Sequence, residues 1–218
     1  MEEISLCTQI KDRYNFLIQA LPTWLKHPFK EIVIFDWNSK KDLKEIRKEF
    51  KDPRIQLFKI ESDFPFSLSQ AKNISHSCSL CKKIVYVDCD VKIEIDFNKF
   101  LNIPEDTFLW GNYKLYNMPG LGCFMITRDQ FEAINGYDER MIGYSYEDVD
   151  FHTRLLKAGY KRKNFPDSVN HIDHNDELRT RFFGEKDKIM GTLKNKMLSL
   201  RTPWTIEDRQ KKFKVIKL

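Results

Sequence analysis

Apolar segments of four or five residues alternate with amphipathic segments through the first half of the chain. The apolar segments predict strands at Ile4–Thr8, Ile32–Phe35, Ile55–Lys59 and Ile84–Val87. Between them, apolar residues recur at helical spacing and predict helices at Arg13–Trp24, Asp42–Phe50 and Ser69–Lys82. Strands that alternate with helices are typical of an α/β fold, in which a mostly parallel sheet has helices on both faces.

The second half of the chain has a different pattern, with aromatic residues, glycines and clear helix-start signals. It predicts a strand at Phe108–Tyr116 and a flexible glycine loop at Pro119–Gly122. The capping-box pattern Thr127–Gln130 opens a short helix that ends at Ile134, and a turn follows at Asn135-Gly136. A second helix runs from Glu147 or Asp148 to Ala158 with Gly159 as its cap, and a strand-like piece ends at Phe165. The tail from Glu177 predicts a basic helix followed by an irregular end.

With 218 residues, the chain is long enough for one domain with a substantial core. No apolar run approaches the roughly 20 residues that span a bilayer. The acidic N-terminus enters a strand at once, which is not the pattern of a signal peptide. We therefore expect a cytoplasmic protein.

The net charge is +5, and Lys and Arg concentrate at Lys157–Lys163 and Lys186–Lys217. A solvated basic surface explains this distribution. The functional alternatives are attraction of a phosphorylated donor, or peripheral binding of the basic tail to anionic lipid at the inner membrane face. Leu193, Met197, Leu198 and Leu200 make the tail partly amphipathic. No motif indicates binding to nucleic acid.

Five cysteines are present, and Cys78-Ser79-Leu80-Cys81 has CxxC spacing with His76 close by. A zinc site needs a second pair of ligands at similar spacing, which the sequence lacks. A redox pair would follow a strand, whereas this pair lies in a helical pattern. We interpret the cysteines as free thiols.

Carboxylates follow two of the predicted strands: Asp36 ends the second, and Asp88-Cys89-Asp90 ends the fourth. Open α/β sheets bind ligands at the carboxyl ends of their strands. Strand-end acids are common in turns, but this placement suits a nucleotide. We expect Asp36 to accept the base N–H, Asp88 to bind the ribose hydroxyls, and Asp90 to reach a cation that bridges two phosphates.

Two further groups carry chemistry. His171 and His174 are three residues apart in a polar stretch, and imidazole suits Mn²⁺ better than Mg²⁺ or Ca²⁺. Glu147, Asp148 and Asp150 open a predicted helix, where acids complement the helix dipole. Three acids exceed what capping requires, so we interpret one of them as a general base.

At this point the residues resemble a known family. Gly122–Arg140, continued by Gly143–Asp150 and Arg154-Leu155, resembles the C-terminal catalytic region of β-1,4-galactosyltransferase-like enzymes. The most specific part is Asn135-Gly136-Tyr137-Asp138-Glu139 followed by Glu147-Asp148. The first half resembles family 2 glycosyltransferases, with Asp36-Trp37-Asn38-Ser39 like their uridine-binding turn and Ala71-Lys72-Asn73 like the helix before their DxD strand.

The resemblance covers about residues 4 to 178 and implies a GT-A (Rossmann-like) α/β fold with a mixed, mostly parallel sheet flanked by helices. It implies one domain with three parts: a nucleotide-sugar-binding half at about 1–107, an acceptor and catalytic half at about 108–178, and a basic C-terminal extension at about 179–218.

The resemblance also implies roles for residues. Asp148 is the implied catalytic base, Glu147 and Tyr144 bind the acceptor, and Asp90, His171 and His174 bind the metal. The nucleotide-sugar is bound by Thr8, Arg13, Asp36, Trp37, Ser39, Lys72, Asn73, Asp88 and Gly122. Tyr144 replaces a tryptophan that contacts both sugars in the family, so the sugars themselves are left open.

The function that follows is an inverting, metal-dependent transfer of a sugar from a UDP-sugar to a glycan or lipid-linked saccharide acceptor, with Mn²⁺ as the cofactor and Mg²⁺ as the alternative. An inactive module of the same fold that binds glycans or acts as a scaffold is the non-enzymatic alternative. A nucleotidyltransferase ranks lower, because such enzymes usually have a glycine-rich loop after the first strand and Cys7–Arg13 contains no glycine.

Overall fold

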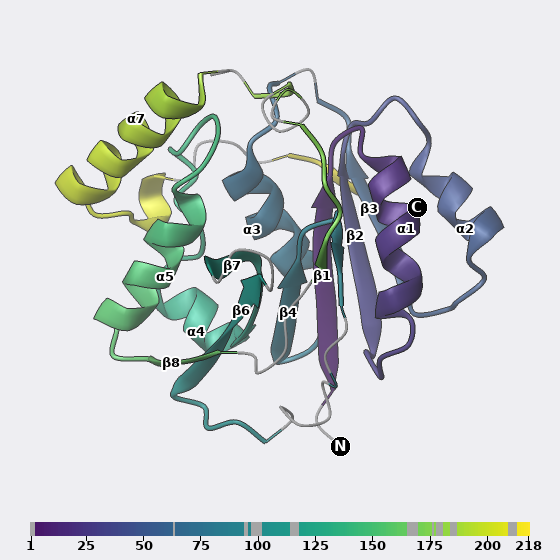
Figure 1. Ribbon diagram of the computed structural model, residues 1–218, viewed down its shortest axis with the longest axis horizontal. Helices are drawn as coiled ribbons and strands as arrows, with labels where there is room; N and C mark the ends of the chain where they lie inside the picture. Colours follow the sequence, from purple (N-terminus) through teal and green to yellow (C-terminus); the bar gives the residue numbers. More distant parts are fainter. Residues whose placement is uncertain are drawn as a thin grey trace.

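The computed structural model describes residues 3–62, 64–93, 96, 102–113, 118–164, 170–175, 177, 181–183, 187–208 and 213–218. Within them, one sheet of eight strands forms the centre of the molecule (Figure 1). Its strands are, in chain order, β1 (Ile4–Ile10), β2 (Glu31–Trp37), β3 (Ile55–Ile60), β4 (Lys83–Val87), β6 (Thr107–Tyr113), β7 (Met118–Thr127), β8 (Lys161–Asn164) and β10 (Val215–Lys217). A small second sheet pairs β5 (Val91–Lys92) with β9 (Asn170–His171).

Across the large sheet the order is β10-β3-β2-β1-β4-β7-β6-β8. The four strands β3, β2, β1 and β4 are parallel, whereas β7 runs antiparallel to both β4 and β6. The sheet is therefore mixed, and its parallel half brings the carboxyl ends of β1, β2 and β4 to one edge.

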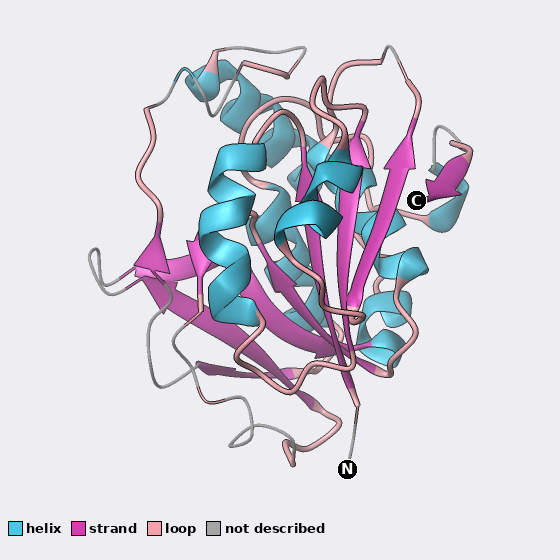
Figure 2. Cartoon of the chain, turned by 90° about the vertical axis from the view of Figure 1, so that its right-hand side faces the viewer, coloured by secondary structure: helices cyan, strands magenta, loops and turns pink. Residues whose placement is uncertain are grey.

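Helices lie on both faces of the sheet (Figure 2). They are α1 (Tyr14–Trp24), α2 (Ile46–Glu49) with the preceding 3-10 turn η1 (Leu43–Glu45), α3 (Leu68–Cys78), α4 (Arg128–Ala133), α5 (Glu147–Lys157), α7 (Lys188–Arg201) and the 3-10 turn η3 (Ile206–Asp208). None of the helices in the described residues is both long and apolar enough to cross a membrane.

Every residue of β1 is buried, because both faces of the sheet are covered. Successive side chains of a strand point to opposite faces. Leu6 packs in the cluster that contains Leu17 and Trp24 of α1, whereas Cys7 packs in the cluster that contains Tyr86 and Phe131. The continuous apolar runs that predicted these strands are thus explained by burial on two sides.

The predicted α/β class with a mixed, mostly parallel sheet is confirmed. The capping box at Thr127 and Gln130 is present, and all five cysteines are free thiols. The predicted ends of two strands, Tyr116 and Phe165, lie outside the described residues.

Four predictions of local structure were wrong. Pro119–Gly122 is part of strand β7 rather than a loop, because β6 supplies its hydrogen-bonding partner. The helix predicted to reach Lys82 ends at Cys78, where Ser79 adopts an extended backbone. The segment Asp42–Phe50 divides into η1 and α2. The C-terminal end is strand β10, which pairs antiparallel with β3 and returns the extension to the first half of the chain.

We expect Gly136→Ala to destabilise the fold more than Gly159→Ala. Both glycines have positive φ, at 68° and 91°, which costs about 1 kcal/mol for alanine. An added Cβ at Gly136 would lie 2.6 Å from Phe131 and 2.7 Å from the Asn73 Oδ1 atom, whereas nothing lies within 4 Å at Gly159. Equilibrium unfolding in denaturant measures both losses. Equal losses would show that close packing at Gly136 contributes nothing.

Candidate active site

A cavity of about 310 Å³ opens at the carboxyl edge of the parallel strands. Its wall combines segments that are far apart in the sequence. The lining residues are Gln9, Lys11 and Arg13 after β1, Phe66 and Leu68 before and at the start of α3, Asp88–Asp90 after β4, Tyr144–Val149 at the start of α5, His171, Asp173 and His174 around β9, and Phe182 and Phe183. This composition places basic, acidic and aromatic groups around one space.

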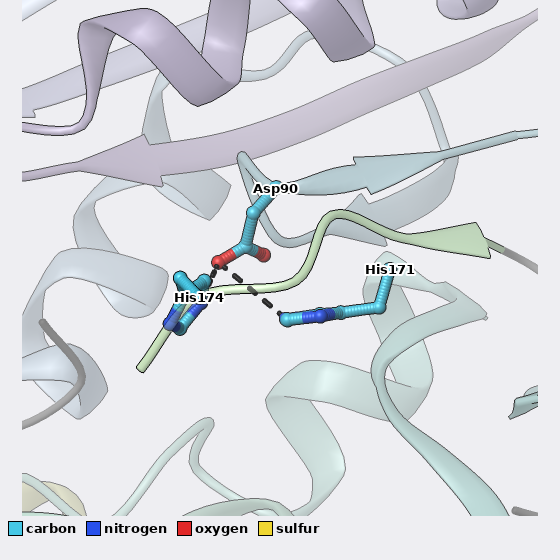
Figure 3. A group of neighbouring side chains, drawn as sticks. All are labelled: Asp90, His171 and His174. Atoms are coloured by element: carbon cyan, nitrogen blue, oxygen red, sulfur yellow. Dashed lines mark hydrogen bonds and ion pairs between the residues drawn. The ribbon is translucent and has the colours of Figure 1, made fainter. Parts of the chain in front are cut away.

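Asp90, His171 and His174 converge on one side of this cavity (Figure 3). The Asp90 Oδ2 atom lies 2.8 Å from the His174 Nε2 atom and 3.6 Å from the His171 Nε2 atom. The pairing of β5 with β9 brings them together, since Val91 is in register with His171 and the Ile172 N–H donates to the Asp90 carbonyl.

One atom from each of these three side chains lies within 4.8 Å of the other two. A carboxylate with two imidazoles is a donor set that fits Mn²⁺ and similar transition metals. Burial raises the pKa of Asp90, but hydrogen bonds from His171 and His174 and the charge of Arg13 outweigh it and hold that pKa well below its usual range. The group thus has the composition of a metal site.

Two further contacts order this side of the cavity. The Arg13 guanidinium donates to the Asp90 Oδ2 atom at 2.7 Å, and the Gln9 amide donates to the Asp88 Oδ1 atom at 2.9 Å. Burial raises the pKa of Asp88; the charges of Asp90 and Asp148 act in the same direction, and Lys72 opposes them. Lys11 and Arg13 add positive charge beside these acids.

Glu147 and Asp148 begin α5 on another part of the wall. The two residues before them, Ser145 and Tyr146, have φ angles of 75° and 80°, a conformation that non-glycine residues adopt at a cost. Burial and the Asp148 charge raise the pKa of Glu147, and Lys72 only partly offsets them.

Lys72 on α3 holds the acidic pair in place. It is 1 % exposed, and its ammonium lies 2.6 Å from the Asp148 Oδ1 atom and 3.6 Å from Glu147. Burial lowers the pKa of Lys72, but the charges of Asp148, Asp88 and Glu147 outweigh it and raise that pKa. The Tyr137 hydroxyl donates to the same Asp148 Oδ1 atom at 2.8 Å.

Helix α7 fastens the loop that leads into α5. The Asn195 side-chain amide donates to the carbonyls of Ile142 and Ser145 and accepts from the Ile142 N–H. The Thr192 hydroxyl donates to the Lys188 carbonyl at 2.7 Å and lies 3.5 Å from the Tyr144 carbonyl. Asn195 is buried, so these bonds are shielded from water. The strained backbone before Glu147 is therefore held by polar groups of a helix about 50 residues away.

Asp150 does not line the cavity. Its carboxylate accepts from Arg154 at 2.7 Å and from the Ser199 hydroxyl at 2.6 Å. The third acid of the helix start thus joins α5 to α7.

The predicted nucleotide-sugar-binding residues separate into two groups. Arg13 and Asp88 line the cavity, whereas Thr8, Asp36, Trp37, Ser39, Lys72 and Asn73 do not. Asp36 accepts hydrogen bonds from the Ser39 hydroxyl and N–H. Trp37 is fully buried against Phe35, Phe66 and Phe213. Their roles in binding stay predictions.

The structure describes the surroundings of two of the remaining residues, Asn73 and Thr8. The Asn73 side-chain amide donates to the Tyr137 carbonyl and to Glu139, and its oxygen accepts from the Tyr137 N–H. Asn73 therefore fixes the loop after Gly136. Thr8 is fully buried, and its hydroxyl has no hydrogen-bond partner in the described part of the chain. Gly122 lies on β7, and the surroundings of its position are outside the description.

Sequence reasoning missed Lys11, Tyr137, Asn195 and the aromatic group Phe66, Phe182 and Phe183. Lys11 had a signal, since it lies beside Arg13 after the first strand. Tyr137 had one too, because it belongs to the segment that resembles galactosyltransferases. The other four depend on contacts between distant segments, for which the sequence gives no local sign.

We expect Lys72→Met to destabilise the protein by about 3–5 kcal/mol, because it leaves two buried carboxylates without their cation. Lys82→Met is the control: its ion pair with Glu105 is also 2.6 Å long but is exposed to solvent, so its loss should change stability far less than the loss of Lys72. Combining Lys72→Met with Asp148→Asn should restore part of the loss. A double variant whose loss equals the sum of the single losses would contradict this coupling.

We expect Asp36→Asn to stabilise the fold above about pH 6. Burial raises the pKa of Asp36 to about 6, against hydrogen bonds from Ser39 that lower it. Because the folded-state pKa is the higher one, the contribution of Asp36 to stability is greatest below about pH 4 and is lost as the pH rises through about 6. The gain on substitution should grow over this window to at most about 3 kcal/mol.

Unfolding free energies of wild type and Asp36→Asn, measured from pH 4 to pH 8, test this. Asp52→Asn is a control of opposite sign, since hydrogen bonds from Arg54 lower the pKa of Asp52. A constant difference between Asp36→Asn and wild type across the pH range would contradict the prediction.

Comparisons with known proteins agree with this geometry. Residues 109–176 match the family model described as the N-terminal domain of galactosyltransferase. No curated protein matches the chain. Among solved structures, the catalytic domain of Drosophila beta1,4galactosyltransferase 7 in complex with xylobiose superposes with a TM-score of 0.67 at 17% identity, covering 97% of this chain and 85% of that one.

Two other enzymes are similar over a smaller share of their own length. GalNAc-T7 with UDP, GalNAc and Mn²⁺ gives a TM-score of 0.71 at 16% identity, covering 92% of this chain and 48% of that one. The mannosyltransferase PcManGT from Pyrobaculum calidifontis with GDP-Man and Mn²⁺ gives 0.63 at 14%, covering 76% and 55%. The chain therefore has the GT-A fold, and its residues 109–176 are similar to a galactosyltransferase domain.

Proposed function

We propose that the protein transfers a sugar from a UDP-sugar to a hydroxyl of a glycan or lipid-linked saccharide, with inversion and with a divalent cation. One observation carries the proposal: a single cavity is lined both by Asp90, His171 and His174 and by the acidic pair Glu147-Asp148. The first group suits a metal-bound diphosphate, and the second suits a general base.

The donor preference follows from the cavity wall and from the relatives. Drosophila beta1,4galactosyltransferase 7 has been solved with manganese, UDP-Gal and xylobiose, and GalNAc-T7 with UDP, GalNAc and Mn²⁺. In this chain, Lys11 and Arg13 place two cations on the wall of the cavity. We assign the phosphates to these basic residues and the ribose hydroxyls to Asp88. We assign the uracil to Asp36, which is the last but one residue of β2, toward the same edge of the sheet.

The residues that would hold the cation are Asp90, His171 and His174, whose donor atoms favour Mn²⁺ over Mg²⁺. Bound there, the cation would neutralise the charge that develops on the departing diphosphate. Arg13, which donates to Asp90, is positioned to share that task through charge-assisted hydrogen bonds to phosphate.

Asp148 is the proposed base. Both of its side-chain hydrogen bonds among the described residues, from Lys72 and Tyr137, fall on the Oδ1 atom. The Oδ2 atom is thereby left to accept the acceptor's hydroxyl proton. As that proton moves to Asp148, the hydroxyl oxygen bonds to the anomeric carbon, the bond from that carbon to the diphosphate oxygen breaks, and UDP leaves with the electron pair. Attack from the face opposite the leaving group inverts the anomeric centre.

Glu147 and Tyr144 are the proposed acceptor contacts. Glu147 lines the cavity beside Asp148, where its side-chain oxygens can hydrogen-bond a sugar hydroxyl. Tyr144 lines the cavity with an aromatic ring, and such rings offer an apolar face with a polar tip. The Lys188 ammonium lies 4.7 Å from the centre of that ring, so α7 contributes to this end of the site.

We expect release of UDP from a suitable UDP-sugar to require a divalent cation, with Mn²⁺ more effective than Mg²⁺, and to stop in excess EDTA.

Asp148→Asn should lower kcat by about 10²–10⁴ while UDP affinity stays nearly unchanged. Asp150→Asn is the matched control: it should cost stability through its bonds to Arg154 and Ser199, with much less loss of rate.

A donor screen for UDP release measures the rate, and calorimetry measures the affinity for UDP. NMR of the product's anomeric configuration tests inversion. Full turnover in EDTA would remove the metal from the proposal. A larger rate loss in Asp150→Asn than in Asp148→Asn, with both proteins folded, would show that the base is misassigned. If the protein binds UDP but neither transfers the sugar nor slowly hydrolyses a UDP-sugar, an inactive module of the same fold is favoured.

A further inference from the structure

Helix α7 turns its polar side toward the protein and its apolar side toward solvent, which is the opposite of an ordinary surface helix. The side facing the protein carries Gly191, Thr192, Asn195 and Ser199. Asn195 donates to the Ser145 carbonyl in the loop before α5, and Ser199 donates to Asp150 of α5. The side facing solvent carries the large apolar residues, with Ile189 73 % exposed and Leu200 66 % exposed, accompanied by Met190, Leu193 and Met197. Surface helices normally bury such a stripe. Figure 1 shows α7 at the outer edge of the molecule, beyond α5.

Basic residues flank this apolar stripe. At 100° per residue, Lys196 lies on one side of the stripe, and Lys194 and Arg201 lie on the other. All three are exposed, and α7 contains no acidic residue. An apolar stripe with basic borders is the arrangement of helices that lie in a membrane interface.

We propose that the outward face of α7, formed by Ile189, Met190, Leu193, Met197 and Leu200, docks the protein on a bilayer that contains anionic lipid. The charge distribution favours this occupant over a second copy of the chain. Two copies related by a twofold axis would bring the same basic borders together without an acidic residue of α7 to oppose them. Anionic headgroups complement those borders instead.

The position of α7 gives this docking a use. Thr192 and Lys188 contact Tyr144, which lines the cavity at its proposed acceptor end. A bilayer against the outward face would therefore lie near the side where the acceptor enters. This part of the inference rests on the proposed function and selects the lipid-linked saccharide as the acceptor class. The docking itself does not depend on transfer.

Flotation of the full chain with vesicles tests the docking. The vesicles consist of phosphatidylcholine alone, or of phosphatidylcholine mixed with phosphatidylglycerol. We expect the wild type to float with the anionic vesicles and much less with the neutral ones. Leu193→Glu combined with Leu200→Glu should reduce the bound fraction by about tenfold or more, because it removes two apolar side chains from the stripe.

Leu80→Glu combined with Leu156→Glu is the matched control. It adds the same charges at two other exposed leucines outside α7, and it should bind like the wild type. Circular dichroism establishes that both double variants are folded. If the α7 variant binds anionic vesicles as well as the control, or if the wild type does not bind them, the docking proposal is wrong. A dimer in solution that the α7 variant dissociates would also overturn it, in favour of an interface between copies.

Release of UDP with a soluble acceptor, measured without vesicles, separates this proposal from the proposed function. We expect the α7 variant to keep wild-type turnover there, since Leu193 and Leu200 do not line the cavity. A wild type that floats but transfers no sugar would overturn the transferase and leave the docking standing. A wild type that transfers sugar but does not float would overturn the docking and leave the transferase standing.

Discussion

The buried charge of Lys72 is the constraint on which the arrangement of the site depends. It lies on α3, in the first half of the chain, and pairs with Asp148 and Glu147 at the start of α5 in the second half. Without it, these two carboxylates and Asp88 would converge on the cavity wall without the lysine charge between them, which is costly for like charges. The ion pair therefore joins the first and second halves of the chain into one electrostatic unit.

The same helix also fixes the loop that carries Tyr137. Asn73, the residue after Lys72, uses both ends of its amide on the Tyr137 backbone. Tyr137 then donates to the same oxygen of Asp148 that Lys72 contacts. Two neighbouring residues of α3 thus orient one carboxylate by two routes, directly through a charge and indirectly through a loop. This redundancy is what a proposed base needs, since its second oxygen must face the cavity in a constant direction.

Helix α7 completes the support from the opposite side. Its polar residues bond the backbone around Tyr144 and Ser145, where the chain adopts the uncommon positive φ angles that lead into Glu147. Strain of this kind persists only where the surroundings over-determine the conformation. Because the polar side of α7 is used for this purpose, its apolar side is left outward. The support of the loop and the proposed membrane face are therefore two consequences of one sequence pattern.

The sequence by itself determined the elements whose signals are local. Strands β1 to β4 follow from continuous apolar runs, the start of α4 from its capping box, and the presence of acids at the ends of β2 and β4 from their order in the chain. The resemblance to galactosyltransferases further pointed to Asp90, His171 and His174 as a group before any geometry was known. The strand and helix signals depend on neighbouring residues, so they can be read from the chain itself.

Only the tertiary structure decided the features that depend on pairing between distant segments. Pro119–Gly122 extends as a strand because β6 lies beside it, although its glycines alone predict a loop. Trp37 lies in an aromatic cluster, because Phe213 returns with the C-terminal strand to cover it. Lys72 neutralises Asp148 across 76 residues, and Asn195 reaches back about 50 residues to hold Ser145. These contacts are set by burial and charge in the assembled core, where each partner lowers the free energy of the other, and no local pattern encodes them.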